Sequence, residues 1–135
     1  MRRVFGKGMS GQAGGEKRDR GSVSIEFIGF LPILLFLALA AVQLGIAAYA
    51  ASQAGTAARA AARSQSVDEP VTGAAAAGSA SMSGWLADGA DFGVADGDEE
   101  VKVTATVKIP SLLPGIGDFG SVSRTSTMPK GEDTE

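Results

Sequence analysis

"FIGFLPILLFLALAAVQLGIAAYAA" occupies residues 27–51 and contains no charged residue. As an α-helix, a stretch of 25 residues spans roughly 38 Å, which exceeds the roughly 30 Å of hydrocarbon in a bilayer. A chain of 135 residues forms one small domain, whose interior cannot surround so long and apolar a helix. The stretch therefore predicts a transmembrane helix and argues against a buried helix of a soluble domain.

The charges on the two sides of this stretch differ in sign. Residues 1–20 carry six Lys or Arg against two Asp or Glu, whereas residues 52–135 carry six against twelve. Basic residues beside a membrane span remain in the cytoplasm. We therefore expect a single-pass protein of the cell membrane, with its N-terminus in the cytoplasm and its C-terminus outside.

Pro32 and a series of small residues divide the apolar stretch. Pro32 cannot donate a hydrogen bond to the carbonyl of Ile28, so a kink is expected there.

Small residues at every fourth position allow a second helix to approach closely. Ala47, Ala51 and Gly55 have this spacing, as do Ala50, Ala54, Ala58 and Ala62. Helix packing is therefore predicted at Ala47, Ala51 and Gly55, together with Gly45, beyond which the small residues begin. A merely alanine-rich helix of high intrinsic propensity would have the same composition.

A carboxylate stands just before the apolar stretch, within "RGSVSIEF" at residues 20–27. Glu26 is the fifth residue after Gly21, which follows the basic leader. A boundary glutamate that reaches the membrane surface has little cost. The spacing from the glycine, however, is that of a type IV prepilin, in which a hydrophilic leader ends in glycine at the cleavage point.

Residues 17–66 resemble the TadE-like pseudopilins of tight-adherence (Flp-type) pilus systems. The resemblance is carried by Glu26-Phe27, by Leu31-Pro32 at the opening of the leucine-rich helix, and by "AARAAARS" around Arg59 and Arg63. It implies a minor pseudopilin, which is a membrane-anchored subunit or assembly factor of the pilus. It also implies partners: a prepilin peptidase, other pilins and pseudopilins, and an inner-membrane assembly platform. We expect the lipid bilayer as a further partner, possible display on a surface pilus, and no nucleic-acid partner.

The same resemblance assigns roles to individual residues. Gly21 would precede the scissile bond, Ser22 would become the mature N-terminus, and Glu26 with Phe27 would act in assembly. Cleavage would give Ser22 an α-amine that is positive near neutral pH. The Glu26 carboxylate could pair with the amine of a neighbouring subunit, and such a pair strengthens where water is scarce.

A secretory signal peptide is the alternative interpretation of the N-terminal region. Ala38-Leu39-Ala40 and Ala48-Tyr49-Ala50 both have the A-x-A form of a signal-peptidase site. Cleavage near Ala40 or Ala50 would release an exported binding module. Against it, the apolar stretch is longer than the roughly 7–15 residues of a signal-peptide core.

The C-terminal half predicts a small α+β domain. The long helix should continue to about Ser66, where Asp68, Glu69 and Pro70 stop it. A short helix ending near Gly89 should follow. Residues 100–109, "EVKVTATVKI", alternate apolar and polar side chains and predict a strand. Weaker strands are expected at 90–95 and 121–128, in an antiparallel sheet that leans on the helix.

The predicted fold class is therefore α+β, with a long transmembrane helix that extends out of the membrane. Residues 1–21 form a basic leader, 22–66 the helix, 67–128 the extracytoplasmic domain and 129–135 a disordered tail.

Little in the composition favours catalysis or cofactor binding. The chain has no Cys and no His, which removes thiolate nucleophiles, imidazole bases and the usual zinc ligands. The G-x-G-x-x-G match at residues 115–120 lacks a following βαβ unit and predicts a loop. The acidic residues at 88–100 lack calcium-loop spacing. We expect no catalytic residue, no metal site and no cofactor. Apolar residues of the loop either complete a thin core or form a docking surface; they are Leu112, Leu113, Ile116 and Phe119.

Overall fold

The computed structural model describes Gly6, Gly8, residues 16–67 and residues 72–131. Most of the predicted leader therefore lies outside the described residues. The same holds for the predicted helix stop at Asp68, Glu69 and Pro70, and for residues 132–135 of the predicted tail.

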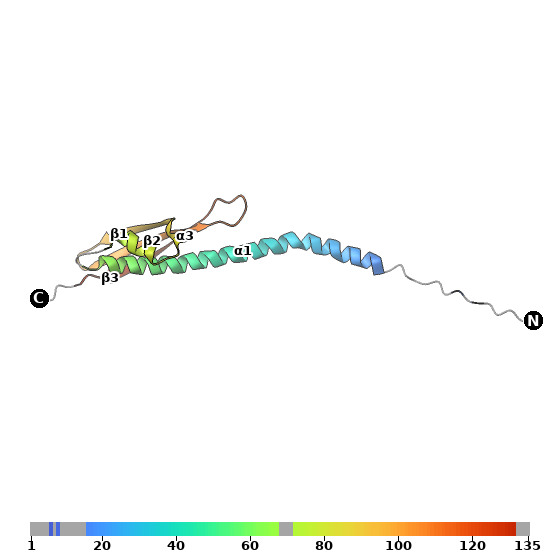
Figure 1. Cartoon of the computed structure of the whole chain (residues 1–135), viewed down its shortest axis with the longest axis horizontal. Coiled ribbons are helices and arrows are strands. Elements are labelled where there is room, and N and C mark those ends of the chain that lie inside the picture. Colours follow the sequence, from blue (N-terminus) through green and yellow to red (C-terminus); the bar gives the residue numbers. More distant parts are fainter. Residues whose placement is uncertain (1–5, 7, 9–15, 68–71, 132–135) are drawn as a thin grey trace, which may run out of the picture. The chain divides into compact units, whose positions relative to one another are not determined.

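The chain forms an α+β structure, as the sequence predicts (Figure 1). Its elements are α1 (Glu16–Gln65), α2 (Ala74–Ala80), α3 (Gly84–Ala87), β1 (Ala90–Asp96), β2 (Glu100–Pro110) and β3 (Asp118–Pro129). The single short helix expected before Gly89 is instead two helices, because glycine and serine at 78–84 are poor helix formers. The chain separates after Ala38 into two compact units.

The first unit contains the beginning of α1. Gly21 to Ala38 are all exposed, including large side chains such as Phe27 (61% exposed), Leu35 (69%) and Leu37 (59%). Among the described residues, α1 is the one helix that is long and apolar enough to cross a membrane. The helix continues through Pro32 without a break in its assignment, and the kink there stays a prediction.

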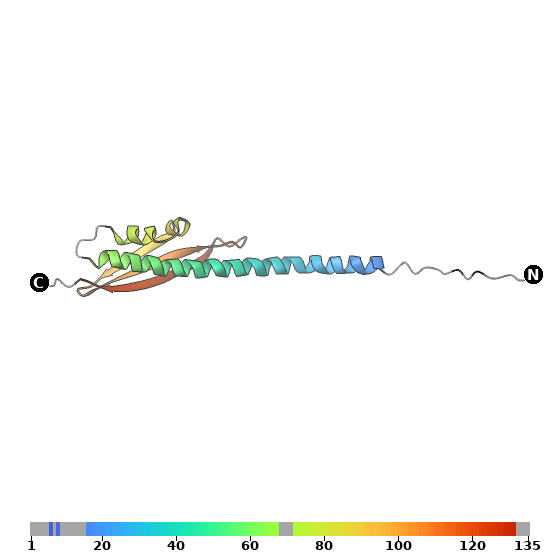
Figure 2. The same cartoon turned by 60° about the horizontal axis from the view of Figure 1, so that its bottom comes forward.

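The second unit is built on an antiparallel sheet in the order β1-β2-β3. In this sheet, Val94 of β1 lies opposite Val103 of β2, and Thr104 of β2 lies opposite Thr125 of β3. Hydroxyl groups bond across the exposed face, with the Thr104 and Thr125 Oγ1 atoms 2.8 Å apart. Figure 2 shows the sheet along the C-terminal part of α1.

The core lies between the inner face of β2 and the alanines of α1. β2 contributes Val101, Val103, Ala105, Val107 and Ile109, the alternating set that the sequence predicts. α1 contributes Ala50, Ala54, Ala57, Ala58, Ala61 and Ala62, all with 0% exposure. Because alanine has only a methyl side chain, the helix backbone approaches the sheet closely. Leu86 of α3 and Met82 complete the core.

The apolar stretch of residues 27–51 lies in two different environments: its first part is exposed, and one face of its last part packs against the sheet. Gln43 is 1% exposed and Ala50 is 0% exposed, because the second unit covers one face of α1 from Gln43 onward. Every residue from Gly21 to Ala38 is exposed, Leu39 and Ala40 are half-buried, and Val42 is the last exposed residue before Gln43. Residues 23–42 span roughly 30 Å as a helix, which matches the hydrocarbon thickness. The stretch is longer than a membrane requires because its last part is the core of the sheet domain.

Candidate functional site

The predicted processing and assembly residues lie in the first part of α1. Gly21, Ser22, Glu26 and Phe27 are all helical and exposed. Ser22 and Glu26 are one helical turn apart and therefore share a face of the helix. The bond between Gly21 and Ser22 lies inside α1, because the helix already begins at Glu16.

The two predicted rows of small residues have different surroundings. Ala50, Ala54, Ala58 and Ala62 are buried in the core of their own domain. In the other row, Ala47, Ala51 and Gly55 are half-buried, and Gly45 is exposed. Only the second row retains free surface, so the predicted packing against another helix stays a prediction for that row alone.

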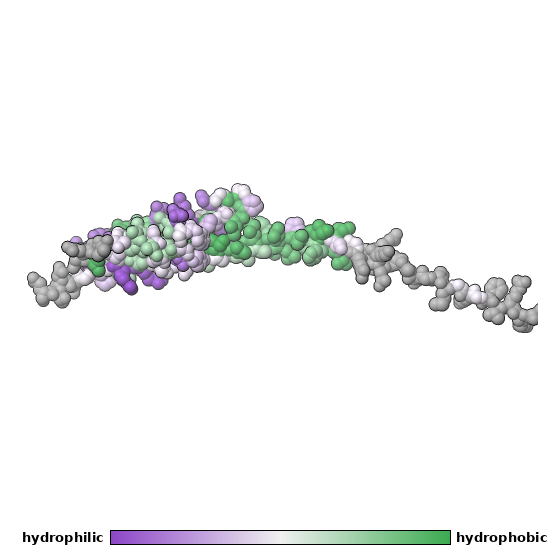
Figure 3. Space-filling model, in the orientation of Figure 1, coloured by the Kyte–Doolittle hydropathy of each residue, from purple (hydrophilic) through white to green (hydrophobic). Residues whose placement is uncertain are grey.

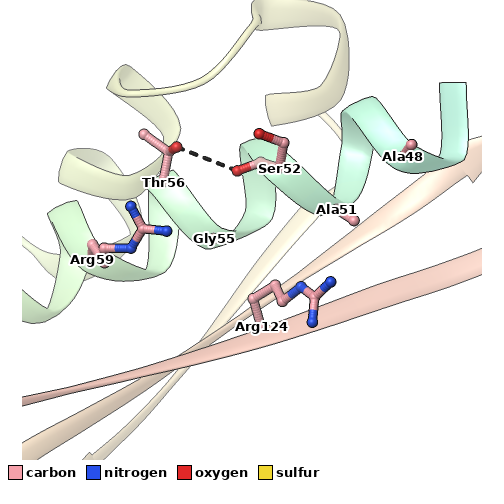
Figure 4. A pocket seen from close by; sticks show the side chains of 7 residues that line it. All are labelled: Ala48, Ala51, Ser52, Gly55, Thr56, Arg59 and Arg124. Carbon is pink, nitrogen blue, oxygen red and sulfur yellow. Dashed lines mark hydrogen bonds between the residues drawn. The ribbon is translucent and has the colours of Figure 1, made fainter. Parts of the chain in front are cut away.

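An open hollow of about 670 Å³ lies beside this second row (Figure 4). Its lining residues on α1 are Ala48, Ala51, Ser52, Gly55, Thr56 and Arg59, and β3 contributes Arg124. The floor consists of small side chains, while the guanidinium groups of Arg59 and Arg124 stand at its edges. We call this surface the cationic hollow. Its small side chains leave room for a neighbouring helix to approach closely.

Sequence analysis did not assign a role to Gln43. Its Nε2 donates to the carbonyl of Pro110 at 2.9 Å, and its Oε1 accepts from the backbone N–H of Leu112 at 2.9 Å. A buried amide is stable when both of its ends are hydrogen-bonded. Gln43 thus ties the loop between β2 and β3 to α1. The sequence could have drawn attention to Gln43, because it is the one residue with a side-chain amide in residues 27–51.

A second polar contact ties α1 to α3. Tyr49 Oη and Ser83 Oγ are 2.6 Å apart, and the backbone N–H of Ser83 donates to Gln53 Oε1 at 3.1 Å. The Tyr49 ring stacks on Trp85 with 6.1 Å between the ring centroids. Both rings remain about half exposed, at 43% for Tyr49 and 54% for Trp85.

Metal and nucleotide sites find no support among the residues that the structure describes. Within them, no group of three or more Asp or Glu side chains is arranged to hold a metal ion. The glycines at 115–120 lead into β3 rather than into a helix, as the loop prediction requires. Gly115 and Gly120 have positive φ angles of 86° and 109°, which glycine adopts without strain. Gly115 lies in the turn, whereas Gly120 lies within β3, beside the register shift in its pairing with β2.

Residues 21–63 match the model of the TadE-like protein family. This part of the chain is similar to TadE-like proteins. No curated protein and no solved structure gives a significant match.

The TadE-like segment begins at Gly21, the residue predicted to precede the scissile bond. It includes Glu26 and Pro32, and it ends at Arg63, close to the end of α1. It therefore contains both the exposed apolar surface and the buried alanine face of the helix. The sheet lies outside the TadE-like match.

Proposed function

We propose that this chain is a minor pseudopilin of a tight-adherence (Flp) pilus, anchored in the cell membrane by α1. The observation that carries the proposal is that the TadE-like match at 21–63 contains the exposed apolar part of α1, which is long and apolar enough to cross a membrane. The basic N-terminal residues favour a cytoplasmic N-terminus, which leaves the sheet domain outside. Its role is structural rather than enzymatic.

A prepilin peptidase removes the leader after Gly21 in this proposal. Since the scissile bond lies within α1, the peptidase must bind a locally unwound form of the helix. Glycine lowers the cost of unwinding, because it is about 1 kcal/mol less favourable in a helix than alanine. The mature helix then begins near Ser22.

Glu26 acts as an assembly residue once the leader has been removed. The new α-amine of Ser22 is a positive charge at a helix N-terminus, where the helix dipole disfavours it. A carboxylate one turn further along offsets this charge, either in the same chain or in a neighbour. In lipid, where unpaired charges are costly, the pairing with other pilins or pseudopilins fixes their axial register.

The signal-peptide alternative predicts a different mature chain. Cleavage after Ala50 would remove Gln43, whose amide bonds both Pro110 and Leu112. It would also cut through the alanine face that covers β2. These contacts argue against cleavage near Ala50, whereas cleavage near Ala40 would leave them in the mature chain.

Mass spectrometry of the mature N-terminus tests the proposal. We expect a chain that begins at Ser22 in cells with the peptidase and an intact leader in cells without it. Gly21→Leu should block processing, whereas Gly29→Leu, which lies away from the scissile bond, should not. A side chain meets open space at both positions, so neither substitution should disturb the fold. A chain that begins near Ala41 or Ala51 would establish the secretory alternative instead.

The hypothesis also names an inner-membrane assembly platform as a partner. The cationic hollow next to Ala51 and Gly55 is the surface that we assign to a neighbouring subunit's helix. Its two guanidinium groups favour a neighbour with carboxylates at the matching height.

A further inference from the structure

The loop between β2 and β3 exposes apolar side chains. Leu112 is 45% exposed, Ile116 is 48% exposed and Phe119, at the start of β3, is 42% exposed. We name these three residues the apolar loop patch. These three side chains therefore do not complete the core, whereas Leu113, the fourth apolar residue of the predicted set, is half-buried. Apolar surface is visible at this end of the sheet domain in Figure 3.

Gln43 fixes the height of the apolar loop patch along α1. Its amide binds the backbone of Pro110 and Leu112, on the two sides of the turn into the loop. The neighbouring helix residues Val42 (53% exposed) and Leu44 (67% exposed) present large apolar side chains at that height. Figure 1 shows the loop projecting beyond the strands and beyond α3.

Several polar backbone groups of the loop are already satisfied within the chain. Leu112 N–H donates to Gln43, Leu113 N–H to Ser111 Oγ at 3.2 Å, and Ile116 N–H to the Leu113 carbonyl at 3.3 Å. Leu113 is followed by a proline, which has no N–H. A segment that enters lipid needs such internal partners, since an unpaired N–H in hydrocarbon costs several kcal/mol.

We propose that the apolar loop patch inserts into the extracytoplasmic surface of the bilayer, as a second membrane contact beside α1. The inference rests on the proposed membrane anchoring by α1. Lipid surrounds a spanning helix on every side, so an element bonded to α1 where its exposed apolar stretch ends lies at the lipid surface. The low charge of this region is consistent with insertion into lipid, because Asp118 is the one charged residue from 109 to 123. Insertion is therefore driven by apolar burial, and salt should not release it.

A single fluorescent label can report the depth of the loop. The chain has no cysteine, so Ile116→Cys provides a unique site for an environment-sensitive dye. We would reconstitute the full chain in phosphatidylcholine vesicles that contain nitroxide-labelled phosphatidylcholine. The expected result is a blue-shifted emission that the lipid-borne nitroxide quenches and aqueous iodide does not. High salt should change neither the emission wavelength nor the quenching by the nitroxide.

Two further labels make the result unambiguous. Asp98→Cys, in the turn at the other end of β2, should be quenched by iodide and spared by the nitroxide. Leu34→Cys, in the exposed apolar part of α1, should be quenched by the nitroxide. If Leu34→Cys is also water-accessible, the membrane anchoring itself fails.

If the Leu34→Cys label lies in lipid while the Ile116→Cys label behaves like that at Asp98, the loop inference is overturned and the anchoring stands. A label at Ile116→Cys that becomes protected only after a second pilus subunit is added would also overturn it. In that case the patch would be a protein interface.

Discussion

Glu26, just before the apolar stretch of α1, and Gln43, within it, are polar side chains with different surroundings. Gln43 is buried and hydrogen-bonded within its own chain. Glu26 is exposed on the helix surface, where a neighbouring subunit can reach it. Both stand out in the sequence. The role of Gln43 could not be predicted, since its partners lie 67 and 69 residues away and no periodic pattern connects them.

Substitution of Glu26 should separate membrane insertion from assembly. We expect Glu26→Ala and Glu26→Gln to insert normally but to lose pili, because neither side chain can neutralise the amine of Ser22. Glu26→Asp retains the charge and should restore at least some pili. Membrane fractionation measures insertion, and electron microscopy of the cells measures piliation. Normal piliation in Glu26→Gln would exclude a role for the charge.

Gln43→Leu should destabilise the sheet domain. The substitution replaces the amide with an apolar side chain of similar size and leaves the Pro110 carbonyl and the Leu112 N–H without their partner. We expect a loss of about 1–3 kcal/mol in the free energy of unfolding, the usual cost of unpaired buried polar groups.

Denaturant unfolding of the full chain in detergent, followed by circular dichroism, measures this loss. Gln65→Leu is the matched control, since the Gln65 amide makes only longer contacts, 3.3 Å to the exposed Thr72 carbonyl and 3.5 Å to Ser64 Oγ. If the two variants unfold at the same denaturant concentration, Gln43 does not hold the loop.

At the scale of elements, the predictable parts were those with a strong repeating pattern. The charge-free stretch predicts α1, and the alternation from Val101 to Ile109 predicts β2 together with its buried face. β3 runs from Asp118 to Pro129, longer than the predicted 121–128, because pairing with β2 extends it. α2 and α3 were expected as one helix, since the glycines and serines at 78–84 carry no clear periodic signal.

Gly78 tests the packing of α2 against the sheet. A Cβ atom at Gly78 would overlap the ring of Phe92 in β1. We expect Gly78→Ala to cost about 1–3 kcal/mol in unfolding free energy, as overpacking of a core does. This loss of unfolding free energy should exceed the stabilisation that alanine provides as the better helix former.

Gly84→Ala is the control for this substitution, because a Cβ atom at Gly84 meets open space. It should be neutral or stabilise the fold by about 0.5–1 kcal/mol, since alanine is the better helix former. Thermal unfolding of both variants in the same detergent gives the comparison. Equal midpoints would show that Phe92 moves aside without cost.

For the whole molecule, the charge asymmetry predicts how the chain crosses the membrane. A membrane-impermeant maleimide should label Asp98→Cys in right-side-out membrane vesicles without lysis. Gly6→Cys, in cells that lack the prepilin peptidase and so keep the leader, should be labelled only after lysis. The reverse pattern would place the sheet domain in the cytoplasm and remove the basis for a pilus role.

The alanine face of α1 sets the thickness of the sheet domain. Methyl groups at Ala54, Ala58 and Ala62 separate the helix backbone from β2, where leucines would hold the two layers further apart. The domain consequently adds little width to the helix that carries it. A filament subunit stands side by side with others around a common axis, and the circumference that each copy occupies limits how many fit in one turn. The methyl side chains of α1 would thus help to set the packing density of the assembly.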